Sequence, residues 1–337
     1  MRGDGPPPAP TPFSITVSDP AFAAIIDPKT KPIELARGFG LNEGPVWFPD
    51  GKSGFVLVSG LLDNVIYKVT LAHKVSVFLE RAGYTGNDPE HAGTQTRSGR
   101  SHVLLIGPSC TARDAQGRLL WCADNDRMVM RLEKDGTRTV LSAGYDGKQF
   151  NGPNDIAIAR DGAIYLADNS FGLRDYGKNP DKQMSDGIYL IRGGKTIKLM
   201  DDKALGGIPN GIALSPDDKY LYLSVGFDLI RRYPVLADGT LGPGEPFTRG
   251  IGMGDGMKTD RAGNLYSTNG GGPGIVRVTA PSGKLLGTLN LPIYGGEPKR
   301  QICATNLAFG GADGRSLFIT ACDALYEVRL KVAAVNP

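Results

Sequence analysis

The sequence predicts an all-β protein, a six-bladed β-propeller with four antiparallel strands per blade. One unit recurs six times along the chain: a polar residue, an apolar run and then a tight turn. Successive units start between 45 and 66 residues apart, which is the length of a blade of four short strands. No segment in the body of the chain keeps a helical period over more than two turns. The six units begin at Glu43, Ser109, Asn154, Asn210, Asp255 and Asn306.

The segment before the first unit contains a leader and one strand. Residues 1–12 are rich in proline and are expected to form a flexible leader, followed by a single propeller domain over residues 13–332. A short helix is expected around Asp19–Ile26, and the first clear strand is Ile33–Arg37. We expect this N-terminal strand to become the outer strand of the last blade. Such pairing would close the ring and leave no free sheet edge at that point.

Within each blade the unit continues as strand, turn and strand. Short runs of β-branched and aromatic residues alternate with Gly, Asp and Asn, which is the pattern of strands joined by hairpins. Two stretches are longer than a hairpin, at residues 81–101 and 169–184, and loops of this length are usually functional lids or disordered excursions. The runs of the first blade are Val46–Phe48, Gly54–Ser59, Asn64–Val69 and Val75–Leu79, and those after the turn in later blades are Arg118–Cys122, Ala163–Ala167, Tyr220–Ser224, Asn264–Thr268 and Ser316–Thr320.

Composition excludes several classes of function. The 337 residues are 40% hydrophobic, enough for a large core, and the net charge of +3 is too small and dispersed for a nucleic-acid or membrane-surface partner. No apolar stretch reaches the roughly 20 residues that span a bilayer. The four cysteines show no CxxC spacing, so a zinc or redox motif is not indicated. Two disulfides and four buried free thiols are both compatible with the sequence.

The leading residues of the six units predict a cation site. Asn, Asp and Glu are poor strand formers, and turn chemistry explains one such residue better than several in identical register. Around a propeller axis these positions would converge. Glu43 and Asp255 supply carboxylates, and Asn154 and Asn210 supply amide oxygens, a set suited to Ca²⁺. No His or Cys falls on the ring, which disfavours zinc and copper as the resident metal.

The motifs around these residues carry a resemblance to a known family. They are Asn42–Trp47, Phe150–Asp155, Ile208–Ala213, Gly254–Met257 and Ala304–Gly310. Together they resemble the gluconolactonase, senescence marker protein and luciferin-regenerating enzyme family over residues 33–330. The resemblance implies a six-bladed propeller with one divalent metal ion in its channel.

The same resemblance implies roles for individual residues. Glu43, Asn210 and Asp255 match metal ligands, Asn154 matches a residue that binds substrate and in some members the metal, and Asp255 also matches the proposed general base. The expected activity is a lactonase with a small-molecule lactone as substrate and one Ca²⁺ ion, for which Mg²⁺, Mn²⁺ or Zn²⁺ could substitute. The metal would polarise the lactone carbonyl, and either Asp255 or a metal-bound hydroxide would activate water.

The pocket around the expected metal departs from the family pattern. Ser109-Cys110 stands where bacterial gluconolactonases usually have Asn-Gly, and Cys122–Asp126 stands where they often carry a His. Ser109, Asn306 and His102 are the remaining candidates for substrate binding. Asp124 and Asp168 end strands in matching register, and we expect them to hold blades or to contact the metal-binding residues rather than bind the metal themselves.

Two other functions remain open on the sequence. An organophosphate or ester hydrolase would use the same ion, because P=O and C=O bonds are polarised alike. A non-enzymatic propeller would bind a ligand or protein and keep the ion for structure, since fold does not dictate function. Oligomeric state and cellular compartment are not predicted.

Overall fold

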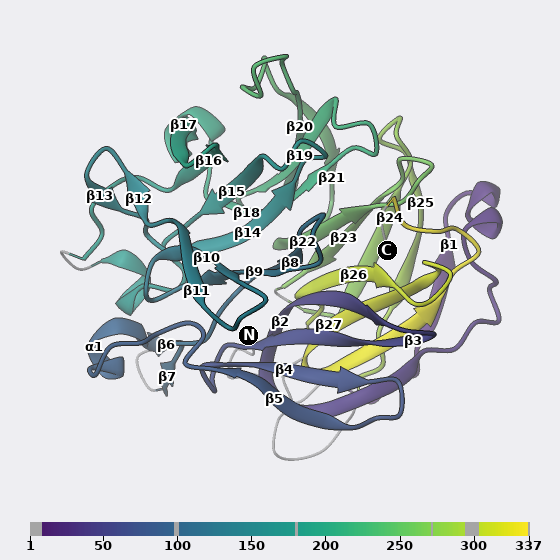
Figure 1. The fold of residues 1–337 in the computed structure, drawn as a ribbon. Coiled ribbons are helices and arrows are strands. Elements are labelled where there is room, and N and C mark those ends of the chain that lie inside the picture. The colour runs from purple at the N-terminus through teal and green to yellow at the C-terminus, as the bar shows by residue number, and fades with distance from the viewer. Residues whose placement is uncertain (1–8, 98–100, 179–180, 271, 294–302, 336–337) are drawn as a thin grey trace.

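The computed structural model of the protein describes residues 9–97, 101–178, 181–270, 272–293 and 303–335. The described residues form five sheets of four or more strands, arranged around a central axis as the blades of a propeller (Figure 1). This confirms the prediction of an all-β propeller.

Four of these sheets are built from consecutive strands, apart from one added edge. They are β8 (Thr111–Arg113), β9 (Leu119–Ala123), β10 (Met128–Leu132) and β11 (Arg138–Ser142); β14 (Pro153–Ile158), β15 (Ile164–Asp168), β16 (Gly187–Arg192) and β17 (Lys195–Asp201); β18 (Pro209–Leu214), β19 (Tyr220–Val225), β20 (Leu229–Pro234) and β21 (Glu245–Arg249); and β22 (Gly254–Thr259), β23 (Leu265–Asn269), β24 (Ile275–Thr279) and β25 (Leu285–Asn290), extended at its edge by β1 (Ser14–Val17).

The fifth sheet has six strands and joins the two ends of the chain. Its order is β26 (Asn306–Gly310), β27 (Ser316–Arg329), β2 (Ile33–Asp50), β3 (Ser53–Gly60), β4 (Val65–Thr70) and β5 (Val75–Glu80). The first part of β2 pairs with β27, with Ile33 opposite Glu327, and its second part pairs with β3. The N-terminal strand therefore pairs with the C-terminal strand as expected. The count of six blades is not confirmed, because the expected first and last blades form one sheet.

Six strands meet at the axis, and each carries or directly follows one of the recurring polar residues. β2 contacts β8, β8 contacts β14, and contacts continue through β18 and β22 to β26, which contacts β2 again. In five of the six units a glycine stands eight positions after the polar residue, in the turn that follows the inner strand. The backbone φ is positive at all six turn positions, including the non-glycine residue Asp218, and glycine adopts this conformation without steric cost. The others are Gly51, Gly117, Gly162, Gly263 and Gly314.

The hydrophobic core lies in layers between neighbouring sheets. Within the six-stranded sheet, Trp47 of β2 stacks on Phe318 of β27 at 5.3 Å between ring centroids. Trp121 of β9 donates a 2.7 Å hydrogen bond from its indole nitrogen to the carbonyl of Ala82, which follows β5. Phe150 and Tyr189 fill a similar layer between the sheets that begin with β8 and β14. The second strand of a blade is buried on both faces. It is therefore a continuous apolar run rather than an alternating one, as in β9 and β15.

The remaining elements are short. Two β-ribbons pair β6 (Thr94–Arg97) with β7 (Ser101–Leu104) and β12 (Gly144–Tyr145) with β13 (Lys148–Gln149). The expected N-terminal helix is a 3-10 turn, η1 (Pro20–Ala24), and the others are α1 (Pro89–Gly93), η2 (Arg174–Gly177) and α2 (Asp202–Leu205). No helix in the described ranges has the length and apolar character needed to cross a membrane.

Most of the leader lies outside the described residues. Thr11 forms an isolated bridge with Ile293 at its end.

Candidate active site

Five of the six recurring polar residues lie together at one end of the inner strands. Asn154 Nδ2 donates a 2.6 Å hydrogen bond to Asn210 Oδ1, and Asn210 in turn hydrogen-bonds the carboxyl of Asp255. On the other side of the ring, the Asn306 side chain hydrogen-bonds Glu43. Glu43, Asn154 and Asp255 are partly exposed, so they can meet a ligand, whereas Asn210 and Asn306 are buried.

Glycines that follow three of these residues let the inner strands approach closely. A Cβ on Gly211 would lie 1.8 Å from the Asp255 carbonyl oxygen, and one on Gly44 would lie 2.5 Å from the Ser109 carbonyl oxygen. A Cβ on Gly256 would lie 2.1 Å from the side chain of Asn306. Each distance is far below van der Waals contact. The X-Gly pairs therefore bring each polar side chain against the next strand of the ring.

Ser109 and His102 are the two further candidates for substrate binding outside the cluster of five. The Ser109 hydroxyl donates a 2.6 Å hydrogen bond to the carbonyl of Pro153, and the residue is 3% exposed. Its one donor is thus used on the backbone that leads to Asn154. His102 lies in β7, and its side chain is outside the described part of the structure. The substrate-binding roles of Ser109, Asn306 and His102 stay predictions.

Asp155, the residue after Asn154, is not predicted from the sequence as part of the cluster. Its carboxylate contacts the neighbouring inner strand. Its carboxylate accepts hydrogen bonds from the backbone N–H of Ile156 at 2.9 Å and of Ile212 at 3.1 Å, and it contacts Asn306. It thereby links two neighbouring inner strands. The signal in the sequence was the Asn154-Asp155 pair, where three other units have glycine in the second position.

Burial raises the pKa of the three carboxyl groups of the ring, and neighbouring carboxylates add to the rise at Glu43 and Asp255. Burial, helped by the charge of Asp155, raises the pKa of Glu43 to about 8, although hydrogen bonds from Gly44 and Asn306 act in the opposite direction. Burial and then the charges of Glu43 and Asp155 raise the pKa of Asp255 well above its usual range. Burial also raises the pKa of Asp155, against the opposing charge of Lys258. Three crowded acids of this kind favour a bound cation, whose charge would restore their ionised forms.

The donor set fits a hard cation better than a soft one. No group of three His, Cys, Asp or Glu side chains that could hold a metal ion occurs among the described residues. The cluster instead mixes the carboxylates of Glu43 and Asp255 with the amides of Asn154 and Asn210. Ca²⁺ accepts carboxylate and amide oxygens alike, whereas zinc sites are built mainly from Cys and His.

The described parts of the two long connections, residues 81–97 and 101 and residues 169–178 and 181–184, lie on the same face as this cluster. The inner strands start at this face. A loop that follows the second strand of a sheet, or that leads from one sheet to the next, therefore lies at this face as well. Asn125 joins the two connections, because its Nδ2 donates to the carbonyls of Ala92 at 3.2 Å and Gly172 at 3.0 Å. His91 Nε2 also lies 3.6 Å from Asp181. These loops border the candidate site.

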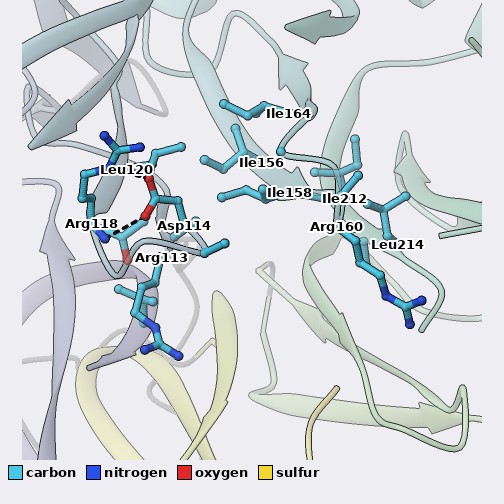
Figure 2. A pocket seen from close by; sticks show the side chains of 18 of the residues that line it. Arg113, Asp114, Arg118, Leu120, Ile156, Ile158, Arg160, Ile164, Ile212 and Leu214 are labelled. Carbon is cyan, nitrogen blue, oxygen red and sulfur yellow. Dashed lines mark hydrogen bonds and ion pairs between the residues drawn. The ribbon is translucent and has the colours of Figure 1, made fainter. Parts of the chain in front are cut away.

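A separate cavity of about 1130 Å³ lies at the opposite end of the inner strands (Figure 2). Its walls combine apolar side chains such as Ile156 and Ile212 with Arg118, which is paired with Asp114 at 2.8 Å. None of the six recurring polar residues lines it. The cavity is therefore distinct from the candidate active site.

All four cysteines form disulfides, and both bonds lie beside the ring. Cys110 pairs with Cys122 across β8 and β9, with 5.0 Å between Cα atoms, and Cys110 directly follows Ser109. Cys303 pairs with Cys322 at a Cα separation of 5.6 Å, and Cys322 lies opposite Asn42 in the sheet. Sequence spacing could not choose between disulfides and free thiols, because the partners meet only when adjacent strands pair.

Comparison with known proteins gives a consistent family. Residues 41–323 match the family described as SMP-30/gluconolactonase/LRE-like region. A gluconolactonase of Zymomonas mobilis is 33% identical over 335 residues, which cover 94% of this chain and 86% of the relative. This confirms the resemblance that the motifs indicated.

Solved structures agree with the sequence relatives. A gluconolactonase from Xanthomonas campestris superposes with a TM-score of 0.74 at 26% identity, covering 97% of this chain and 99% of that one. Regucalcin from Agrobacterium tumefaciens, described as a calcium-binding protein, has the same fold with a TM-score of 0.63 at 20% identity, covering 96% of both chains. The chain belongs to the SMP-30/gluconolactonase/LRE-like family.

Proposed function

We propose that this protein is a divalent-metal-dependent lactonase that opens sugar-acid or related lactones. The observation that carries the proposal is the cluster of Glu43, Asn154, Asn210 and Asp255 at one end of the ring, in a chain related to gluconolactonases. Ca²⁺ is the expected ion, with Mg²⁺, Mn²⁺ or Zn²⁺ as substitutes. Glu43, Asn154, Asn210 and Asp255 would hold it.

We also propose that the propeller has six blades. The six-stranded sheet counts as two blades, because β2 changes partner from β27 to β3 near Asn42. β27 likewise pairs with β26 in its first part and with β2 in its second. The closed ring of six inner strands supports this count.

In the proposed reaction, the bound ion and Asp255 have different roles in ester hydrolysis. A bound divalent cation would act as a Lewis acid toward the lactone carbonyl oxygen. Asp255 would accept a proton from the attacking water, whose oxygen forms the new bond to the carbonyl carbon; the alternative is that the bound metal itself supplies the hydroxide. The bond from that carbon to the ring oxygen breaks, and the proton passes to the departing alkoxide. The product is the open hydroxy acid.

Asn154 is assigned to the substrate as well as to the ion. Its Nδ2 is a donor at the partly exposed rim, and in the ligand-free ring it is directed to Asn210. A lactone oxygen could replace Asn210 as its acceptor. Glu43, Asn210 and Asp255 could hold an ion that serves only the structure, so a substrate contact at Asn154 is the feature that separates a hydrolase from a binding protein.

The proposal is tested by pH-stat titration with five- and six-membered lactones, with added Ca²⁺ and after EDTA treatment. We expect acid release above background only with the metal, and loss of it on chelation. Phosphotriesters and simple esters assayed in parallel would reveal the alternative hydrolase. If metal-loaded protein opens no lactone above background, the lactonase proposal is wrong.

A further inference from the structure

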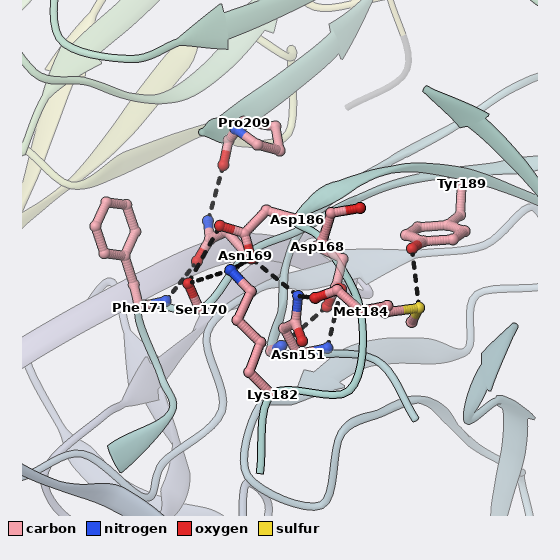
Figure 3. Close-up of polar contacts among 12 residues, drawn as sticks. Asn151, Asp168, Asn169, Ser170, Phe171, Lys182, Met184, Asp186, Tyr189 and Pro209 are labelled. Carbon is pink, nitrogen blue, oxygen red and sulfur yellow. Dashed lines mark hydrogen bonds and ion pairs between the residues drawn. The ribbon is translucent and has the colours of Figure 1, made fainter. Parts of the chain in front are cut away.

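Asp168 and Asn169, at the end of β15, hold the backbone that leads to Asn154. Asp168 Oδ2 accepts the N–H of Asn151 and its Oδ1 accepts the N–H of Gly152, both at 2.9 Å (Figure 3). The backbone N–H of Asn169 donates to the carbonyl of Gly152 at 3.1 Å. Asp168 is fully buried, so these bonds are shielded from water. The segment is therefore fixed two residues before Asn154.

The side chain of Asn169 reaches the neighbouring sheet. Its Nδ2 donates a 2.9 Å hydrogen bond to the carbonyl of Pro209, the residue directly before Asn210. The N–H of Phe171 donates to Asn169 Oδ1 at 3.0 Å, which orients the amide so that its nitrogen faces Pro209. One dipeptide thus bonds to the segments that carry both Asn154 and Asn210.

A buried polar network around Asp186 holds the side chain of Asn151, whose backbone bonds to Asp168. Asn151 Nδ2 donates to Asp186 Oδ1 at 2.9 Å and to the Met184 carbonyl at 3.0 Å. Asp186 is also paired with Lys182 Nζ at 3.0 Å and accepts from Ser170 at 3.1 Å (Figure 3). The network leaves the Asn151–Gly152 backbone little freedom to move.

Among the described residues, the corresponding aspartate of the preceding sheet, Asp124, makes no such bonds. Asp124 follows Cys122-Ala123 as Asp168 follows Leu166-Ala167, yet its Oδ1 has no hydrogen-bond partner in the described structure. The segment before Ser109 ends in Pro108, which has no N–H, and the N–H of Gly107 donates to Leu61. The pair of hydrogen bonds from the backbone to an aspartate is thus present before the proposed ligand Asn154. In the described structure it is missing before Ser109.

We propose that Asp168 and Asn169 are positioning residues, which set the separation of Asn154 and Asn210 so that both side chains can bind one ion. This inference rests on the proposed function, in which those two residues are metal ligands. The 2.6 Å contact between Asn154 and Asn210 is the geometry that the pair maintains. Displacing a functional side chain by about 1 Å can cost about 10²-fold in rate.

The test compares Asp168→Asn and Asn169→Ala with a matched control, Asp260→Asn. Asp260 is equally buried and accepts the N–H groups of Ala262 and Asn264, both at 2.9 Å, but it lies at the far end of its inner strand. In Asp168→Asn, an NH₂ group would face a backbone N–H, so one bond is lost with little change in shape. Asn169→Ala removes only the two hydrogen bonds of the Asn169 amide, to Pro209 and from Phe171. This second variant keeps the inference testable if Asp168→Asn does not fold.

We expect both test variants to weaken calcium binding about tenfold or more by calorimetry and to lower kcat, as loss of groups that orient ligands does. Asp260→Asn should lower Tm while its calcium Kd stays within about twofold of wild type. Equal calcium Kd and kcat in Asp168→Asn and Asp260→Asn at similar Tm would overturn the inference.

Crystal structures of the ion-free variants separate this inference from the proposed function. The Asn154–Asn210 contact should be lost in Asp168→Asn and kept in Asp260→Asn, whether or not the wild type opens lactones. An intact contact in Asp168→Asn would refute positioning. Wild-type protein that binds no divalent cation would instead refute the proposed metal centre.

Discussion

Asn154 and Asn210 belong to neighbouring sheets and are 56 positions apart in the chain, yet their side chains share a 2.6 Å hydrogen bond. The contact exists because β14 and β18 lie side by side at the axis. Asp255 continues it on β22. The proposed ligands of one ion thus come from strands that are distant in sequence, so an ion bound there would also tie the sheets together.

Substitutions at Asp255 and Asn154 should affect different quantities. Asp255→Asn removes a ligand charge and the proposed base, so both calcium affinity and kcat should fall, the latter by about 10²- to 10⁴-fold. Asn154→Ala removes a neutral ligand and the substrate contact, so it should mainly lower kcat and raise KM, with a smaller loss of calcium affinity than in Asp255→Asn. Calorimetry and initial-rate kinetics on both variants check this. Equal effects of the two changes on calcium affinity would contradict the assignment.

The close approach of the inner strands at Gly211 should not tolerate a side chain. Gly211→Ala places a Cβ 1.8 Å from the Asp255 carbonyl oxygen, so we expect a loss of about 1–3 kcal/mol in the free energy of unfolding and weaker calcium binding. Gly242→Ala is the control, because its Cβ would meet Pro234 at an ordinary 3.5 Å. Urea unfolding of both variants measures the difference, and equal stability would argue against the close packing.

The disulfides predict a dependence on redox conditions. The native protein should show no thiol that reacts with Ellman's reagent even in denaturant, since all four cysteines are paired. The bonds close segments of 12 and 19 residues, for which loop closure predicts about 3 kcal/mol each. Cys303→Ser with Cys322→Ser should therefore lower Tm. A free-thiol count of four in denaturant would show that the bonds do not form.

Asp168 should make stability depend on pH with a defined sign. Burial raises its pKa to about 7, against the hydrogen bonds from Asn151 and Gly152, from about 3.9 in the unfolded chain. Between these values the folded state binds more protons at this site, so its contribution to the free energy of unfolding falls as pH rises from about 4 to 7. Asp168→Asn has no titrating group at this position, so this contribution to the free energy of unfolding does not vary with pH in the variant.

The measurement is chemical denaturation of both proteins between pH 5 and 8. The stability of wild type relative to Asp168→Asn should decrease as pH rises toward 7 and then level off. Parallel profiles for the two proteins would mean that the Asp168 carboxyl has an ordinary pKa.

Much of the fold followed from local pattern. The positive φ at Gly51, Gly162 and the equivalent turns has a local cause, so glycine marks each hairpin in the sequence. The pairing of Ile33–Arg37 with the C-terminal strand also followed, because an unpaired edge would be exposed. Asp155 was missed because its role depends on the N–H of Ile212 in the next sheet, which no local pattern reveals.

By itself, the sequence determined the propeller class, the register of the polar residues and the family. These depend on short-range rules of turns, strand composition and motif spacing. Only the tertiary structure decided which cysteines pair, which face the long loops cover, and that Asp168 bonds to the backbone while Asp124 does not. Those outcomes depend on distances between groups on different strands, and such distances exist only once the sheets have closed around the axis.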